Sequence, residues 1–234
     1  MPPPTAEGAS SSDKASTPAY PFPSDSVFVD GHPLPRLVVF DLDYTLWPFW
    51  VDTHVSAPVK LGSPGTTSKD GEFVPASVVD KFGESYAFYP DVPYMLQALP
   101  LAGVMMGIAS RTHAPELARE FLAHLKVPHK AKKEVRALDV FAAGLEIYPS
   151  NKLQHMTALH KRTAIPYEEF LFFDDESRNL NVETLGVKMK LVKGALDWPM
   201  MEQGVKEWRT KHGHSGGSDK PRVRGGRGGK ASKQ

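Results

Sequence analysis

Two acidic side chains follow an apolar run early in the chain, at a spacing that suits metal and phosphate chemistry. Asp41 and Asp43 come directly after Leu37–Phe40. Residues two apart in an extended segment point to the same side, so the two carboxylates can share one face. Held close together they repel each other, and a divalent cation is the natural means of neutralising them. Capping of a helix by Asp and Thr45 is the alternative explanation.

A hydroxyl and a guanidinium group follow a second apolar run. Ser110 and Arg111 come after residues 104–109, whose sequence is VMMGIA. A hydroxyl together with the free amides that open the next helix can bind phosphate oxygens. An ordinary helix cap ahead of Pro115 explains the same residues, so the pattern alone leaves both interpretations open.

The remaining candidates are a lysine and a second acidic pair. Lys152 stands at the start of a predicted helix, where its charge opposes the helix dipole. Asp174 and Asp175 follow the apolar residues 170–173. A helix cap again explains this pair, but both carboxylates stand at the tip of a predicted central strand. Each signal is ambiguous by itself.

Unbroken apolar runs alternate with amphipathic stretches, which predicts an α/β fold with a doubly wound, Rossmann-type parallel sheet. We expect strands at Leu37–Phe40, 104–109, 170–173 and 187–192, with a less clear fifth at 140–147. We expect helices at 92–99, 115–126, 151–163 and 176–185. Ligands of such sheets bind beyond the carboxyl ends of the strands, so the polar residues at those ends should meet in one crevice.

The ends of the chain differ in composition from its middle. Residues 1–35 hold eight Pro and six Ser, and residues 211–234 hold seven Gly with seven Lys/Arg against one Asp. Such segments cannot bury enough surface to fold, so we expect two disordered tails around one domain at 36–210. The overall charge of +1 then divides into +6 for the basic tail and −5 for the rest. The Arg222–Lys230 segment resembles RGG segments, so weak RNA binding by this tail is the alternative function.

Composition also excludes several kinds of protein. The chain has no cysteine, which excludes disulfides, cysteine-ligated zinc and a thiolate nucleophile. No run of about 18 apolar residues could span a bilayer, so we expect no membrane association. The polar, proline-rich start lacks the pattern of a secretory signal, and we expect a location in the cytoplasm or the nucleus.

Taken together and in order, these residues resemble the haloacid dehalogenase superfamily of phosphotransferases. Residues 40–46, FDLDYTL, match its first motif, while Ser110, Lys152 and the Asp174–Asp175 pair fall where its later motifs belong. The longer string 41–54, DLDYTLWPFWVDTH, is similar to the eukaryotic magnesium-dependent phosphatase family within it. The resemblance covers about 36–200. The chain departs from the family at Ser150, where glycine is usual, and in a longer, more basic segment at 126–140.

The resemblance implies specific roles. Asp41 is the nucleophile that forms an aspartyl phosphate, and Asp43 is the acid and base. The ligands of Mg²⁺ are the Asp41 carboxylate, the Asp43 carbonyl and Asp175, with Asp174 as its neighbour or the alternative ligand. The phosphate-binding residues are Leu42, Ser110, Arg111 and Lys152.

Substrate choice follows from the short spacing between motifs. About 60 residues separate Asp43 from Val104, which leaves room for only a small flap at about 52–89 and a minimal cap. Gly62–Gly65 and Lys69–Gly71 are typical of turns in this flap. The resemblance implies acid or protein-tyrosine-type phosphatase activity toward phosphopeptides or small phosphosugar-type molecules. Response-regulator receiver domains use similar residues, but there the lysine follows the acidic groups, and here Lys152 precedes the last pair.

Overall fold

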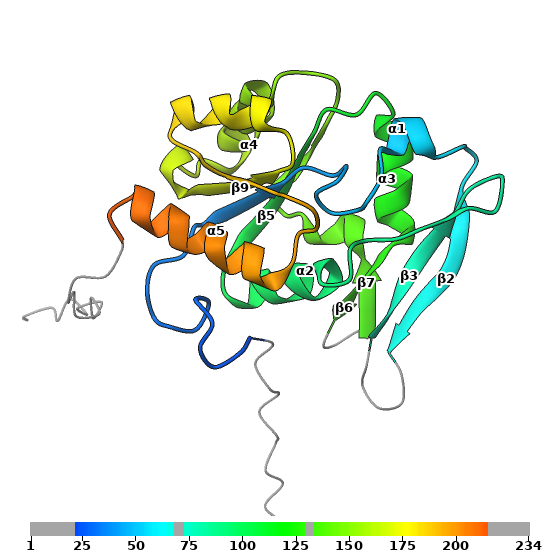
Figure 1. The fold of residues 1–234 in the computed structure, drawn as a ribbon, viewed down its shortest axis with the longest axis horizontal. Helices are drawn as coiled ribbons and strands as arrows, with labels where there is room; N and C mark the ends of the chain where they lie inside the picture. The colour runs from blue at the N-terminus through cyan, green and yellow to red at the C-terminus, as the bar shows by residue number, and fades with distance from the viewer. Residues whose placement is uncertain (1–21, 68–72, 130–132, 215–234) are drawn as a thin grey trace, which may run out of the picture.

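The computed structural model describes residues 22–67, 73–129 and 133–214. Its centre is a five-stranded parallel sheet in the order β10-β9-β1-β5-β8. The strands are β1 (Leu37–Phe40), β5 (Met105–Ser110), β8 (Gly144–Ile147), β9 (Phe170–Asp174) and β10 (Lys188–Leu191). All five strands predicted from the apolar runs are therefore present, and the parallel α/β fold is confirmed (Figure 1).

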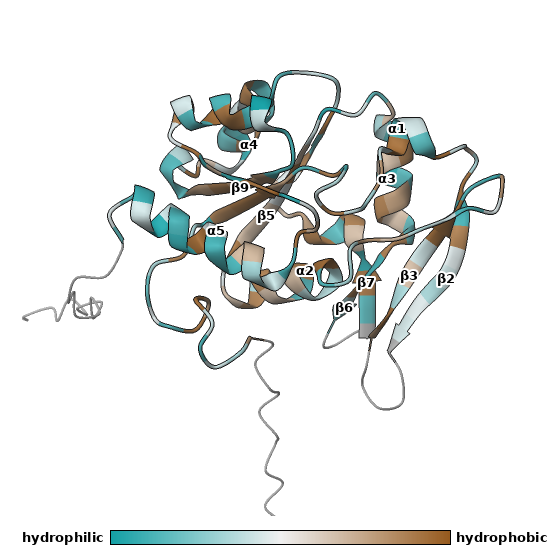
Figure 2. Cartoon of the chain, in the orientation of Figure 1, coloured by the Kyte–Doolittle hydropathy of each residue, from teal (hydrophilic) through white to brown (hydrophobic). Residues whose placement is uncertain are grey.

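Alternate residues of the central strand β1 pack into two different cores. Val38 and Phe40 belong to the larger core, whereas Leu37 and Val39 belong to the smaller one on the opposite face. Because both faces are covered, the strand has no polar face, which explains its unbroken apolar sequence. Figure 2 shows the resulting apolar colouring of β5 and β9 between helices with polar outer surfaces.

Helices cover both faces of the sheet. The larger core contains residues of α2 (Val92–Leu101), α3 (Pro115–His124) and α5 (Trp198–Lys211). The smaller core contains residues of α4 (Lys152–Thr163) and of η3 (Ser177–Leu185). The segment predicted as a helix at 176–185 is thus a 3₁₀ helix. Among the described residues, no helix is both long and apolar enough to cross a membrane.

Two small antiparallel sheets stand beside the main one (Figure 1). The flap consists of α1 (Val51–His54), β2 (Lys60–Thr67), β3 (Phe73–Val79) and β4 (Ser85–Tyr86). The prediction of a turn at Gly62–Gly65 is wrong, because these residues lie inside β2. The pairing register of β2 with β3 shifts between Leu61 and Pro64. The second expected turn lies outside the described residues. Within the basic segment at 126–140, β6 (Lys126–His129) pairs antiparallel with β7 (Lys133–Arg136), and η1 (Ala137–Val140) follows.

The last part of the expected N-terminal tail is packed against the domain. Phe22, Val27 and Phe28 are buried in the larger core, and the guanidinium of Arg209 on α5 donates to Asp30 at 2.6 and 3.0 Å. The expected boundary at residue 35 is therefore wrong, because these scattered apolar residues find partners that are distant in sequence. The rest of that tail, and the RGG-like segment at the other end, lie outside the described residues.

Candidate active site

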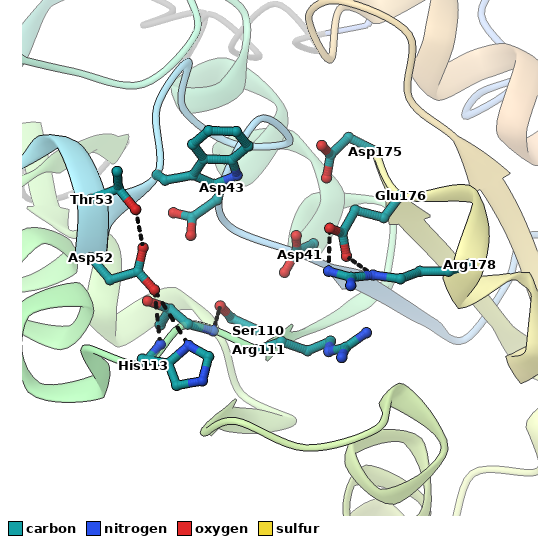
Figure 3. A pocket seen from close by; sticks show the side chains of 12 residues that line it. Asp41, Asp43, Asp52, Thr53, Ser110, Arg111, His113, Asp175, Glu176 and Arg178 are labelled. Carbon is teal, nitrogen blue, oxygen red and sulfur yellow. Dashed lines mark hydrogen bonds and ion pairs between the residues drawn. The ribbon is translucent and has the colours of Figure 1, made fainter.

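The carboxyl ends of three neighbouring strands bring the predicted site residues together. Asp41 follows β1 and donates its backbone N–H to the Phe173 carbonyl at 2.9 Å, while Ser110 and Asp174 end β5 and β9. Asp41 and Ser110 border a cleft of about 430 Å³, shown from close by in Figure 3. The cleft is lined by Asp41, Asp43, Trp50, Asp52, Thr53, Ser110, Arg111, Thr112, His113, Asp175, Glu176 and Arg178.

Lys152 is the cation at the base of this arrangement. Its side chain is 1% exposed, and its Nζ lies 2.7 Å from Asp41 Oδ1 and 2.9 Å from Asp174 Oδ2. The same ammonium donates to the Ala109 carbonyl. Burial alone lowers the pKa of Lys152, but Asp41 and Asp174 outweigh that effect and hold the pKa above its usual value. Lys152 therefore remains a cation, and its unexpected position at the helix start is explained by these two carboxylates.

The buried carboxylates carry more negative charge than Lys152 neutralises. Burial raises the pKa of the Asp41 carboxyl well above its usual value, and Asp174 adds to this rise while Lys152 opposes it. Burial also raises the pKa of Asp175 to about 6, and the charge of Asp174 contributes. Carboxylate oxygens of Asp41, Asp174 and Asp175 all lie within 4.8 Å of one another. Clustered oxygen ligands with surplus negative charge fit a hard divalent cation.

The two aspartates of the last motif have different surroundings. Asp174 Oδ1 accepts from the Asn179 amide at 2.9 Å and from the Glu176 N–H at 2.7 Å. Asp174 Oδ2 accepts from the same amide and from Lys152. Asp175, by contrast, lines the cleft directly, as Figure 3 shows.

Asp43 stands beside Asp41 in the cleft. Its Oδ1 accepts from the indole N–H of Trp47 at 2.7 Å and from the Val51 N–H at 3.1 Å. Burial raises the pKa of Asp43 to about 6, although these two hydrogen bonds oppose the rise. A carboxyl with such a pKa is suited to donating and accepting a proton near neutral pH.

The predicted phosphate-binding residues also reach this edge. Ser110 Oγ accepts from the Thr112 N–H at 3.3 Å, and Arg111 donates to Asn179 at 3.3 Å. The Leu42 side chain is buried in the larger core, so that only its backbone can contribute to phosphate binding.

Sequence reasoning missed several residues of the cleft. Asp52 accepts from the His113 N–H at 3.1 Å and from the Thr53 hydroxyl at 3.0 Å, linking α1 to the loop after β5. Glu176 pairs with Arg178 at the opposite side, as Figure 3 shows. Asp52 and Thr53 lie within the string 41–54, so their membership of that match was the available signal, whereas no local pattern distinguishes Arg178 from an ordinary surface group. His155 on α4 is buried, with its ring nitrogens 3.0 Å from the Asn151 and Tyr148 carbonyls.

The chain is similar in sequence to several known proteins. The acid phosphatase family profile matches residues 33–211. A HAD-like hydrolase superfamily protein of Schizosaccharomyces pombe is 42% identical over 165 residues, which cover 70% of this chain and 90% of the relative. Human magnesium-dependent phosphatase 1 is 39% identical over 173 residues, which cover 74% of this chain and 86% of the relative.

Among solved structures, the N-terminal part of the Bacteroides fragilis protein BF1531, which contains a phosphatase domain complexed with Mg, is 15% identical. The matched part covers 77% of this chain and 40% of the Bacteroides fragilis chain, with a TM-score of 0.43. The range 33–211 that the family profile matches contains all of the motifs at the strand ends. The chain therefore belongs to the acid phosphatase family, among the magnesium-dependent phosphatases of the haloacid dehalogenase superfamily.

Proposed function

We propose that this phosphatase hydrolyses phosphomonoesters through an aspartyl phosphate on Asp41, with Mg²⁺ as cofactor. The observation that carries the proposal is the contact of Lys152 with both Asp41 and Asp174 at the base of a cleft that Asp43 also lines. Asp41, Asp175 and the backbone carbonyl of Asp43 would hold the metal. When bound, Mg²⁺ supplies positive charge that offsets the carboxylates and the incoming phosphate. Because the oxygens of Asp174 are engaged by Asn179, Glu176 and Lys152, we assign direct ligation to Asp175.

The chain's own residues account for two transfers of the phosphoryl group, first to Asp41 and then to water. Because Lys152 holds Oδ1 of Asp41, we assign attack on phosphorus to Oδ2. The bond from phosphorus to the leaving oxygen breaks as Asp43 gives that oxygen a proton. In the second step Asp43 takes a proton from water, the water oxygen bonds to phosphorus, and the bond to Asp41 breaks. Inorganic phosphate leaves, and both aspartates return to their starting states.

Ser110, Arg111 and Lys152 supply donors and positive charge around the transferring group. The cleft is bordered by the small flap, so it suits phosphate on a peptide or on a small molecule. We propose phosphotyrosine or phosphosugar-type substrates on this basis and on the resemblance of residues 41–54 to the eukaryotic magnesium-dependent phosphatase family. RNA binding by the basic tail stays a separate prediction.

The test uses a generic aryl phosphate with Mg²⁺, with EDTA, and with the Asp41→Asn variant. We expect turnover with Mg²⁺ alone, and its loss in the other two cases. Rapid acid quench after mixing with a ³²P-labelled substrate should trap label on the wild-type chain and none on Asp41→Asn. Equal turnover by both proteins would contradict the nucleophile assignment. A panel of phosphotyrosyl peptides and sugar phosphates then decides the substrate class.

A further inference from the structure

Trp47 contacts Asp43, the proposed acid and base, without itself lining the cleft. Its indole N–H donates to Oδ1 of Asp43 at 2.7 Å, and the ring is fully buried. The backbone N–H of Val51 donates to the same oxygen at 3.1 Å. Both donors therefore hold one oxygen of the Asp43 carboxyl.

The indole is itself fixed by aromatic neighbours. It stacks on Phe49 with a centroid distance of 5.3 Å and an interplanar angle of 3°, and Phe88 stacks at 6.1 Å. Phe121 of α3 packs against it at 5.8 Å. A bicyclic side chain enclosed in this way cannot swing aside without disturbing the core. The indole donor is therefore held rigidly in place.

Two N–H donors at Oδ1 determine which oxygen can exchange a proton. A proton on Oδ1 would be directed at the hydrogens of Trp47 and Val51, so Oδ1 remains an acceptor. Oδ2 is then the oxygen that gives a proton to the leaving group and takes one from water.

We propose that Trp47 is a positioning residue, which orients Asp43 so that Oδ2 meets the leaving oxygen. This inference rests on the proposed function. It predicts that Trp47 matters most for esters whose leaving group is a poor one and needs protonation, such as alkyl, sugar and unactivated aryl phosphates. Esters with a good leaving group depend on it little. A purely structural role in the core predicts no such difference.

The experiment compares Trp47→Phe with Trp208→Phe. Phenylalanine keeps an aromatic ring but removes the indole donor. Trp208 is a matched control, because it is also buried and donates its Nε1–H to a backbone carbonyl, that of Glu168, at 2.8 Å. The substrates are phenyl phosphate and p-nitrophenyl phosphate, which differ in the acidity of the leaving phenol. The readout is kcat/KM, which reports the first transfer.

For Trp47→Phe we expect kcat/KM to fall at least about tenfold on phenyl phosphate, and no more than about threefold on p-nitrophenyl phosphate. Trp208→Phe should change kcat/KM by the same factor for both substrates. Equal losses on the two substrates for Trp47→Phe would overturn the inference. Failure of the proposed function is distinct, since the wild-type protein would then show no Mg²⁺-dependent turnover of either ester.

A second measurement covers the case in which Trp47→Phe does not fold. The indole N–H resonance of Trp47 in the wild-type protein should shift when Asp43 is changed to Asn, because the charged acceptor is lost. The Trp208 resonance should stay in place. An unchanged Trp47 resonance would also overturn the inference.

Discussion

The ammonium group of Lys152 lies 2.7 Å from Oδ1 of Asp41, although 111 residues separate the two along the chain. The contact joins the start of α4 to the end of the central strand. The side chains of Lys152 and Asp41 are only 1% and 11% exposed, so water offers these two charges little compensation. The pair therefore exists only where α4 is packed against the end of the central strand.

Replacing Lys152 by Met should damage both stability and turnover. The change leaves Asp41 and Asp174 as buried carboxylates without their cation, and breaking such a pair costs about 3–5 kcal/mol. Chemical denaturation measures this loss, and turnover of an aryl phosphate should disappear. Lys188→Met is the control, because Lys188 pairs with Glu183 and Glu207 away from the cleft at 3.6 and 3.2 Å. It should cost at most about 1 kcal/mol and retain turnover. Similar stability losses in the two variants would contradict the role of the buried cluster.

Asp175→Asn and Asp174→Asn should affect the protein in different ways. We expect Asp175→Asn to raise the Mg²⁺ concentration for half-maximal turnover at least about tenfold, because a direct ligand loses its charge. Asp174→Asn should mainly lower the thermal stability, since Asp174 holds Lys152 and Asn179. A magnesium titration of turnover and a thermal melt in EDTA measure the two effects. If the larger magnesium effect appears in Asp174→Asn, the assignment of the direct ligand is reversed.

The raised pKa of Asp43 predicts how stability depends on pH without metal. Burial raises this pKa from the model-peptide value of 3.8 to about 6, so the folded chain takes up the proton more readily than the unfolded chain. The stabilisation that Asp43 contributes is fully present below about pH 4 and is lost as the pH rises to about 6. In EDTA, the free energy of unfolding of the wild type should thus fall over this window more steeply than that of Asp43→Asn. If the free energy of unfolding changes with pH in the same way for both proteins, the raised pKa of Asp43 is refuted.

Trp50 provides a test of how the cleft accommodates the leaving group. Its indole is 49% exposed, lines the cleft, and meets the Tyr44 ring edge-on at 5.1 Å. Trp50→Ala should raise KM for aryl phosphates by roughly fivefold, which corresponds to about 1 kcal/mol of aromatic stacking. Phe82→Ala removes another exposed ring, 75% exposed and absent from the cleft lining, and should leave KM unchanged. The same KM in Trp50→Ala as in the wild type would show that the ring does not contact substrate.

The sequence was most informative where structure is determined locally or by burial on both sides. Unbroken apolar runs predicted β1, β5 and β9, because parallel strands covered on both faces need no polar alternation. The location of the site was predictable from the topology, because the carboxyl ends of parallel strands bring Asp41, Ser110 and Asp174 to one edge of the sheet.

Features that depend on distant partners could not be predicted in this way. Residues 22–35 show no periodicity, and they contact distant residues of α5: Phe22 and Phe28 pack against Trp198, and Asp30 pairs with Arg209. Gly62–Gly65 has the composition of a turn, yet pairing with β3 keeps it in a strand. The contact of Trp47 with Asp43 was missed because an aromatic residue after the first motif is equally consistent with simple core packing.

The position of β1 in the sheet has a consequence for synthesis of the chain. This strand emerges from the ribosome first of the five, yet its neighbours are β5 and β9, and β9 ends only at Asp174. Until residue 174 has emerged, one edge of β1 has no native partner, and such an edge can pair with another chain. Most of the domain must therefore be made before the segment that carries Asp41 and Asp43 is protected, and chaperone binding during translation should concentrate on that interval.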